Sequence, residues 1–381
     1  MAKKRLIYVS SPYTGAVVEG QVYELLEYYK QQDWFEDVLL LQSYASENDR
    51  KKSEEVLSNF SFRKKFFWMN PYYPFFYKKS IKALKKTMNE EITQNTVFHV
   101  RSGVFGHYVR EALSTELSNL LILVEFRGAL SDELKYTSTV KLKERIKARI
   151  KIIHINKCYG RMQKDEKMVY TAVSPLLRII ESKEDGFDVN KIFVHPNIAA
   201  NYFKYNLEQR IAIRKELGVK DNQVLVVTSS GESGMWQKDL DLVDSLTAKG
   251  FVVLNLSKKT LNKPNVISRF VPHKEMPSYL SACDAALLWR DDVLLNNVAC
   301  PSKYCEFAEM GLYVIHNKTV DIATRFIKDN NCGLLVDTPE EIELPLELFS
   351  EEARQLRCSI GHKTFSVEEI AKSYRNILQE S

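Results

Sequence analysis

The sequence predicts an α/β fold in which two doubly wound parallel-sheet domains face a cleft. Short apolar segments alternate with longer helical ones, a pattern typical of a parallel sheet covered by helices on both faces. The pattern starts afresh after residue 222, and 381 residues exceed one ordinary core. We expect an N-terminal domain over residues 1–195 and a C-terminal domain over residues 196–364, with ligands bound outside the carboxyl ends of the strands.

Apolar segments of strand length recur through both predicted domains. In the first, helices over residues 18–30 and 106–118 are expected between strands over residues 5–11, 37–43, 96–103 and 120–128. In the second, strands are expected over residues 223–231, 251–257, 266–271, 285–290, 312–317 and 332–337. Residues 191–203 contain a proline and asparagines, so we expect a connector there.

The composition is that of a globular protein, with 45% hydrophobic and 27% charged residues. No run approaches the roughly 18 apolar residues of a membrane span, and the N-terminus fits a first strand better than a signal peptide. The six cysteines form no CxxC pair and have no histidine at metal-ligand spacing, so we expect free thiols and a cytoplasmic protein.

The net charge of +5 is unevenly distributed. Residues 62–86 contain eight Lys or Arg, nine aromatic residues and no Asp or Glu, and residues 141–157 form a second basic run. Cations interleaved with aromatic rings suit the surface of an anionic membrane, to which the protein would bind peripherally. The same composition also suits nucleic acid, and a third interpretation is a packed core with a solvated basic face.

Several predicted strands end in residues suited to a binding site. Gly15 follows the first strand and would let a ligand approach the backbone, although it is equally well interpreted as a loop glycine. His99 fits a structural role, whereas Arg101, two residues later, suits binding at the edge of a cleft. Arg127 ends the next strand, and either acidic residue that follows could pair it for structural reasons.

Residues 228–238, TSSGESGMWQK, are rich in small residues ahead of a predicted helix. The backbone N–H groups of Ser230 and Gly231 are suited to phosphate oxygens. The segment matches neither GxxxxGK[ST] nor GxGxxG. The DLD sequence at residues 239–241 resembles a metal-binding DxD, but it begins a helix, where carboxylates ordinarily complement the dipole, so we expect no metal site.

Residues 300–315, CPSKYCEFAEMGLYVI, predict a helix from Ser302 to Met310 that stops at Gly311 before a short strand. Lys303 and Glu306 lie three residues apart and share a helix face near the end that favours anions. Taken alone, this pair is equally well interpreted as a surface ion pair.

This segment and the preceding residues 271–290, VPHKEMPSYLSACDAALLWR, resemble the C-terminal domain of GT-B glycosyltransferases, specifically the retaining family 4 type that builds bacterial surface glycans. Residues 125–133, 169–180 and 191–203 resemble other family segments in the same order. Residues 365–381 resemble the final helix that crosses back to the first domain. The matching motif positions are Met276, Pro277, Tyr279, Leu280, Asp284, Pro301, Lys303, Glu306, Gly311, Val314 and Ile315.

The resemblance implies two Rossmann-like domains and places Glu306 at the second glutamate of an E-x7-E motif, which holds the ribose of a nucleotide sugar. A buried carboxylate accepting two ribose hydroxyls forms strong, charge-assisted hydrogen bonds. The first glutamate of the motif falls at Val298, a departure from the family. Its contact with the donor sugar would then pass to neighbours such as Asn296 or Asn297, or the sugar would be held differently.

The resemblance also implies that cations and helix N-termini, without an essential metal or cofactor, stabilise the leaving diphosphate. Lys238 and Lys303 are the main candidates for this charge, and Arg101 and Arg127 could position the acceptor or the diphosphate. The residues expected to bind the donor are Gly15, Ser230, Gly231, Lys238, Arg269, Asn297, Pro301, Ser302, Lys303 and Glu306.

Three functions agree with these residues. The first is a glycosyltransferase that moves a sugar, with retention, from a UDP- or GDP-linked donor to a glycan or polyprenyl-linked precursor at an anionic membrane face, with no nucleic acid as partner. The second is a sugar-nucleotide epimerase of the same fold, which needs no acceptor. The third is a catalytically silent binding subunit, which the valine at position 298 favours.

Overall fold

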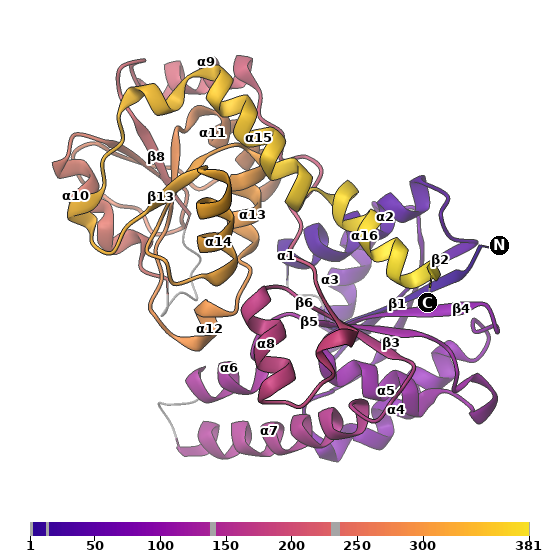
Figure 1. Cartoon of the computed structure of the whole chain (residues 1–381). Helices are drawn as coiled ribbons and strands as arrows, with labels where there is room; N and C mark the ends of the chain where they lie inside the picture. The colour runs from indigo at the N-terminus through magenta and orange to yellow at the C-terminus, as the bar shows by residue number, and fades with distance from the viewer. Residues whose placement is uncertain (1–2, 13–14, 138–141, 230–236, 381) are drawn as a thin grey trace. The chain divides into compact units, whose positions relative to one another are not determined.

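The computed structural model describes residues 3–12, 15–137, 142–229 and 237–380, which form two compact units (Figure 1). Unit 1 comprises Met1–His195 and Ile370–Ser381, and unit 2 comprises Pro196–Glu369. Each unit is built on its own sheet, and every strand pair in both sheets is parallel. The predicted pair of doubly wound parallel-sheet domains is therefore confirmed.

Unit 1 has a seven-stranded sheet in the order β3-β2-β1-β4-β5-β6-β7, so the strand order reverses between β1 and β4. Its central strands are buried on both faces, which explains why they are nearly continuous apolar runs. The strands are β1 Arg5–Ser10, β2 Asp37–Tyr44, β3 Arg63–Trp68, β4 Thr96–Arg101, β5 Ile122–Phe126, β6 Met168–Ala172 and β7 Ile192–Val194.

Helices cover both faces of this sheet. Figure 1 shows α2 and α16 above the strands and α4, α5 and α7 below them. Capping residues fix several starts: Ser174, for example, accepts a hydrogen bond from Leu177 N at the beginning of α8. The helices are α1 Ala16–Val18, α2 Glu24–Gln31, α3 Glu47–Leu57, α4 Tyr77–Met88, α5 Gly103–Ala112, α6 Leu130–Thr137, α7 Leu142–Met162, α8 Pro175–Lys183 and α16 Val367–Glu380.

Unit 2 has a six-stranded sheet in the order β10-β9-β8-β11-β12-β13, which reverses between β8 and β11. The strands are β8 Leu225–Thr228, β9 Val252–Asn255, β10 Val266–Ser268, β11 Ala285–Leu288, β12 Tyr313–His316 and β13 Gly333–Leu335. The helices are α9 Leu207–Leu217, α10 Val243–Ala248, α11 Met276–Ala282, α12 Leu294–Asn297, α13 Ser302–Glu309, α14 Asp321–Asn330 and α15 Glu351–Phe365.

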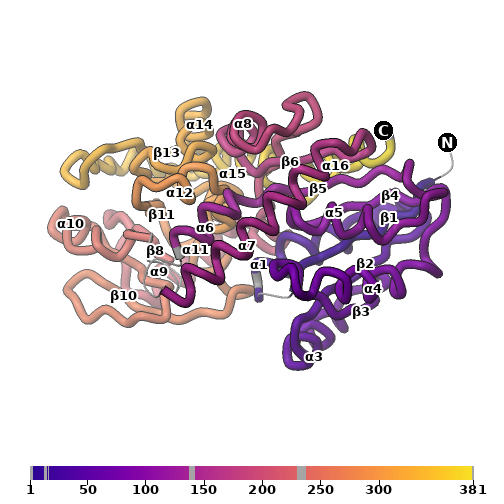
Figure 2. The backbone as a smooth tube through the Cα atoms, turned by 90° about the horizontal axis from the view of Figure 1, so that it is seen from below, coloured from indigo at the N-terminus to yellow at the C-terminus, as the bar shows by residue number. Residues whose placement is uncertain are grey.

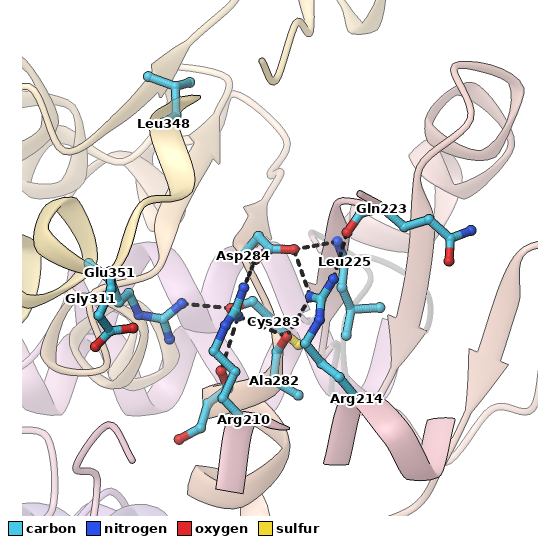
Figure 3. Close-up of polar contacts among 12 residues, drawn as sticks. Arg210, Arg214, Gln223, Leu225, Ala282, Cys283, Asp284, Gly311, Leu348 and Glu351 are labelled. Atoms are coloured by element: carbon cyan, nitrogen blue, oxygen red, sulfur yellow. Dashed lines mark hydrogen bonds and ion pairs between the residues drawn. The ribbon is translucent and has the colours of Figure 1, made fainter. Parts of the chain in front are cut away.

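Asp284, which immediately precedes β11, ties together the amino ends of the unit 2 strands (Figure 3). Its carboxylate accepts hydrogen bonds from Arg210 Nη2 at 2.5 Å, Arg214 Nη1 at 3.0 Å and Leu225 N at 2.8 Å. Ligands of open parallel sheets bind at the opposite, carboxyl ends. The match of Asp284 to the family motif therefore has a structural reason.

Three expectations for secondary structure need correction. Residues 192–194 were expected in a connector but form β7, because they pair with β6 and close the edge of the first sheet. Residues 63–68, RKKFFW, form β3, a strand that was not predicted because three of its six residues are basic. The helix expected over residues 18–30 is interrupted by a π-helical turn at Glu19–Tyr23.

The predicted stop at Gly311 is confirmed. This glycine has φ +65° after α13, and a Cβ there would lie 2.5 Å from Cys358 Sγ and 2.6 Å from the Arg354 carbonyl oxygen. A side chain would therefore collide with α15 as well as strain the backbone. Within the described ranges, none of the helices is long and apolar enough to cross a membrane.

Candidate functional site

The predicted ribose-binding residue Glu306 lies on α13 and is buried, with 4% of its surface exposed. His273 Nε2 lies 3.0 Å from Glu306 Oε1, and Tyr202 Oη lies 2.7 Å from His273 Nδ1. Because a carboxylate only accepts hydrogen bonds, His273 donates to Glu306 through Nε2 and accepts a hydrogen bond from the Tyr202 hydroxyl at Nδ1. The interpretation of Glu306 as half of a surface ion pair with Lys303 is therefore wrong.

Glu306 Oε2 is buried and has no hydrogen-bond partner among the described residues. Three further polar atoms at the carboxyl ends of β8 and β11 share this condition: Thr228 Oγ1, Ser229 Oγ and Arg290 Nε. Buried polar atoms are ordinarily satisfied, and each exception needs an explanation. Their position at the reversal of the strand order, where open sheets bind ligands, makes a polar ligand the simplest explanation.

Positive charge accompanies these open atoms. Burial lowers the pKa of Lys303, whereas Glu306 and Asp239 act to raise it and Arg290 lowers it further. Burial also lowers the pKa of Arg290, against the opposing effect of Asp239. Two cations held in a partly desolvated place are stabilised by an anion, which a nucleoside diphosphate supplies.

The first turn of α13 adds backbone donors. Its N-cap is Pro301, and the N–H groups of Ser302 and Lys303 have no acceptor within the helix. The partial positive charge of a helix N-terminus adds to that of the Lys303 side chain. Pro301, Ser302, Lys303 and Glu306 are therefore brought together as the sequence predicted.

Lys238 and Asp239 lie beside the carboxyl end of β11. Lys238 Nζ lies 3.9 Å from Asp291 Oδ2, and its backbone N–H donates to the Trp289 carbonyl at 3.0 Å. Asp239 Oδ1 accepts from Trp289 N at 2.6 Å. The DLD sequence begins a 3₁₀ helix, Asp239–Leu242, so its first carboxylate organises the carboxyl end of β11.

Other predicted donor residues lie elsewhere or have structural bonds. Arg269 is exposed and follows β10, at the edge of the sheet. Asn297 Nδ2 donates to Asp292 Oδ1 at 2.8 Å and to the Thr319 carbonyl at 2.9 Å. Ser230 and Gly231 fall outside the described residues.

The position of the first motif glutamate is occupied by a core residue. Val298 is fully buried at the end of α12, and Asn296 Nδ2 donates to the Asp291 carbonyl at 2.8 Å. The Asn296 and Asn297 amide nitrogens thus hold the α12 segment in place. Position 298 carries no carboxylate, and contact of Asn296 or Asn297 with the donor sugar stays a prediction.

In unit 1, Arg101 and Arg127 line a pocket of about 380 Å³ at the carboxyl ends of β4 and β5. Aromatic side chains form much of the remaining wall, together with Glu133, whose pKa is raised by burial. Gly103 begins α5 beside this pocket, and a Cβ there would lie 2.7 Å from Tyr159 Cε1. Arg101 Nη1 is buried without a hydrogen-bond partner among the described atoms.

Glu125, beneath this pocket, is the centre of a buried cluster. Its Oε1 accepts from Tyr8 Oη at 2.9 Å and lies 2.8 Å from His99 Nε2. Its Oε2 lies 3.1 Å from Arg127 Nη1 and 3.6 Å from Arg101 Nη1. Burial alone would raise the pKa of Glu125, but Arg127, His99 and Arg101 together hold that pKa well below its ordinary value. His99 is therefore structural.

Gly15 follows β1 in unit 1, with φ +98° and no heavy atom within 4 Å of an added Cβ. The loop position thus needs a glycine for its backbone conformation. Its carbonyl accepts from Val18 N at 2.9 Å. Its role in donor binding stays a prediction.

Sequence analysis missed His273, Arg290 and Tyr202. His273 and Arg290 both lie within residues 271–290, the stretch that carries the family resemblance, so their position was a signal. Tyr202 lies 71 positions before the histidine that it contacts, and only tertiary structure could reveal that pairing. No group of three or more His, Cys, Asp or Glu suited to a metal ion occurs among the residues with described positions.

No protein-family model matches the chain, and no curated protein sequence does either. Solved structures do match over its full length. A glycosyltransferase from Rickettsia africae is 14% identical, with a TM-score of 0.71 over 100% of this chain and 99% of that one. HepE of Anabaena, crystallised with UDP, is also 14% identical, with a TM-score of 0.68 over 99% of this chain and 100% of that one.

Sucrose-phosphate synthase from Thermosynechococcus elongatus is 12% identical, with a TM-score of 0.64 and complete coverage of both chains. These structural neighbours are GT-B glycosyltransferases, and the chain shares their fold. Identities this low establish the fold alone. Membership of family 4 stays a prediction.

Proposed function

We propose that this protein is a glycosyltransferase of family 4 type that moves a sugar from a UDP- or GDP-linked donor to a glycan or lipid-linked glycan precursor. One observation carries the proposal: Glu306 is buried with one oxygen held by His273 and the other unpartnered. An open carboxylate oxygen beside buried cations fits the ribose and diphosphate of a nucleotide sugar. The complex of the similar HepE structure with UDP supports the same ligand class.

In this proposal Glu306 accepts the ribose hydroxyls, while the diphosphate lies against the first turn of α13. The N–H groups of Ser302 and Lys303 and the side chains of Lys303 and Arg290 face the charge that grows on the leaving oxygens. The acceptor hydroxyl forms the new bond to the anomeric carbon as the bond to the diphosphate breaks, and its proton passes to solvent or a base. Preorganised donors stabilise this charge, and retention follows the family.

The acceptor would occupy the 380 Å³ pocket of unit 1. Tyr72 and Tyr159 offer ring faces and hydroxyl groups that suit a sugar, and the open Nη1 of Arg101 offers a donor to a hydroxyl or a phosphate. A site of this size and polarity matches small-ligand pockets in general.

Peripheral binding to an anionic membrane surface belongs to the same proposal, and the bonds of the basic residues favour α4 as the part that would bind. Lys64 donates to the Leu57 and Phe60 carbonyls, and Lys65 pairs with Glu91 at 2.6 Å, so these two cations are already used within the fold. The lysines of α4 are exposed and stay available to lipid phosphates: Lys78, Lys79, Lys82, Lys85 and Lys86. Peripheral binding would therefore depend on α4 more than on β3.

A catalytically silent binding subunit is the second candidate. The buried Val298 favours it, because the carboxylate that contacts the donor sugar in the family is absent at that position. Such a subunit would bind the nucleotide through Glu306 but release no product.

A scan of UDP- and GDP-sugars separates the two candidates. The purified protein is incubated with each donor, with and without a lipid-linked acceptor, and free nucleoside diphosphate is measured. The proposed transferase releases diphosphate only when the acceptor is present. Nucleotide binding without release from any donor would instead support the silent subunit, and the absence of nucleotide binding would contradict both.

A further inference from the structure

A second cavity in unit 1, of about 360 Å³, lies between α7 and the segment that begins α4. Pro74, Tyr77, Ile150, Ile153 and Cys158 supply apolar wall, and most of the lining is apolar. Figure 2, viewed from below, shows α7 on the near side of unit 1. The volume of the cavity lies within the range of small-ligand sites, yet none of the proposed donor or acceptor residues lines it.

An exposed apolar stripe leads to this cavity. Leu142, Ile146, Ile150 and Ile153 follow one another at helical spacing on one face of α7. Ile153 is 63% exposed at the rim, and Phe75, beside Pro74, is 78% exposed. A continuous apolar approach to an apolar cavity is unusual on a water-facing surface and indicates a ligand or membrane contact.

The cavity also carries positive charge that the fold does not neutralise. Arg161 Nη1 donates to His107 Nε2 at 3.0 Å and to Tyr77 Oη at 3.3 Å. Burial, and then Arg161, lower the pKa of His107 to about 4, so this imidazole is neutral at pH 7. Of the charged side chains of α7 that the structure describes, only Lys147 pairs with a carboxylate, Glu144, at 3.0 Å.

Lys157, like Arg161, lines the cavity and forms no ion pair with a described residue. The cavity therefore combines an apolar interior with two cations that lack a carboxylate. Both cations are exposed to solvent, so the anionic head group of a ligand can reach them while its apolar part lies against the isoleucines.

We propose that this cavity binds one anionic lipid, with a hydrocarbon chain along Ile150 and Ile153 and a phosphate group at Lys157 and Arg161. The site adds a specific lipid contact to the general attraction of the α4 lysines for a membrane. It lies in unit 1, apart from the residues that would hold the nucleotide, so it does not depend on the proposed transferase activity.

The test uses dodecyl phosphate as a soluble lipid surrogate, below its micellar concentration, in calorimetric titrations of the full chain. We expect saturable binding of one molecule. Shortening the chain by two methylene groups weakens binding about tenfold, since each buried methylene contributes to transfer from water. Inorganic phosphate alone, and dodecyl maltoside with its neutral head group, bind at least tenfold more weakly.

Two variants with matched controls locate the site. Ile153→Glu places a carboxylate at the rim and should weaken binding of dodecyl phosphate at least tenfold. Its control is Ile211→Glu on α9 of unit 2, because Ile211 is also 63% exposed. Arg161→Gln should weaken binding about fivefold or more, whereas Arg149→Gln, an exposed position of the same helix outside the cavity, should leave it unchanged.

All four variants should keep the circular dichroism spectrum and the urea unfolding midpoint of the unmodified protein, which shows that they are folded. Lack of saturable dodecyl phosphate binding would overturn the proposal. So would equal effects of Ile153→Glu and Ile211→Glu, or full competition by inorganic phosphate, which would make the site one for a free anion.

Discussion

Glu125 in unit 1 and Glu306 in unit 2 are both buried carboxylates, but their oxygen atoms are used differently. Both oxygens of Glu125 lie close to cations or donors within the fold. Glu306 uses Oε1 with His273, and Oε2 has no partner among the described residues. The comparison shows that two buried carboxylates of one chain differ in how many of their oxygens the fold already uses.

The largest expected effect is on stability, and it should appear at Glu125. Glu125→Ala removes the partner of Arg101, Arg127 and His99, which stay buried, so we expect a loss of about 3–5 kcal/mol in the free energy of unfolding. Glu306→Ala leaves only the partly exposed His273 without its partner and should cost less than about 1 kcal/mol. Urea unfolding of both variants measures the difference. Equal losses would remove the distinction between the two carboxylates.

Acid should destabilise both units through buried histidines, and in unit 1 His107, whose pKa burial also lowers to about 4, acts together with His195. Burial lowers the pKa of His195 in unit 1 and of His316 in unit 2 to about 4. Below pH 6.5 the unfolded chain takes up the proton first, so stability that is complete above pH 6.5 is lost as the pH falls toward 4.

Each histidine should therefore cost up to about 2 kcal/mol between pH 6.5 and pH 5. Unfolding curves at pH 7 and pH 5 measure this loss. His195→Asn and His316→Asn should each reduce the pH dependence of the free energy of unfolding, and each reduction measures the contribution of the histidine that was replaced. A free energy of unfolding that does not change between these pH values would contradict the buried neutral state of both.

A smaller effect is expected at His273, which positions Glu306 through its hydrogen bond to Oε1. His273→Ala should weaken UDP or GDP binding by about 0.5–1.5 kcal/mol, the net contribution of one hydrogen bond. His273→Gln keeps an N–H donor and should recover most of the affinity. If the glutamine variant binds as poorly as the alanine variant, His273 acts by some route other than its bond to Glu306.

The smallest expected effect is that of metal removal. Cations of the protein face the leaving diphosphate in our proposal, so EDTA should change the rate of diphosphate release less than about twofold. Loss of activity that Mn²⁺ restores would contradict this assignment, and Asp239 would then need a role beyond its bond to Trp289 N.

The fold and part of the candidate site could be predicted from the sequence because their signals are local. The alternation of short apolar segments with longer helical ones predicted the two sheets, and the spacing of Lys303, Glu306 and Gly311 predicted the helix and its end. The ion pairs that the basic residues of β3 form within the fold could not be predicted in this way. Arg63 and Lys65 pair with Glu91, 28 and 26 positions away, so a basic strand of the fold resembled a membrane-binding segment.

The roles of Glu125 and His273 likewise depend on residues far along the chain. Tyr8 lies 117 positions before Glu125, and His273 lies 33 positions before Glu306. No local pattern distinguishes a glutamate with two occupied oxygens from one with an open oxygen. That difference appears only when every partner of each carboxylate is known.

The central claim is that the open oxygen of Glu306 holds the ribose of a nucleotide, and calorimetric titration of UDP and GDP tests it most directly. Glu306→Ala should weaken the preferred nucleotide by about 1.5–3 kcal/mol, the range for hydrogen bonds to a charged group. Glu309→Ala is the matched control on α13: Glu309 also bonds a histidine, His362 at 2.7 Å, and also has a buried Oε2 without a partner among the described residues, but it is the last residue of the helix. It should leave the affinity unchanged. Equal affinities of the unmodified protein and a folded Glu306→Ala variant would contradict the claim.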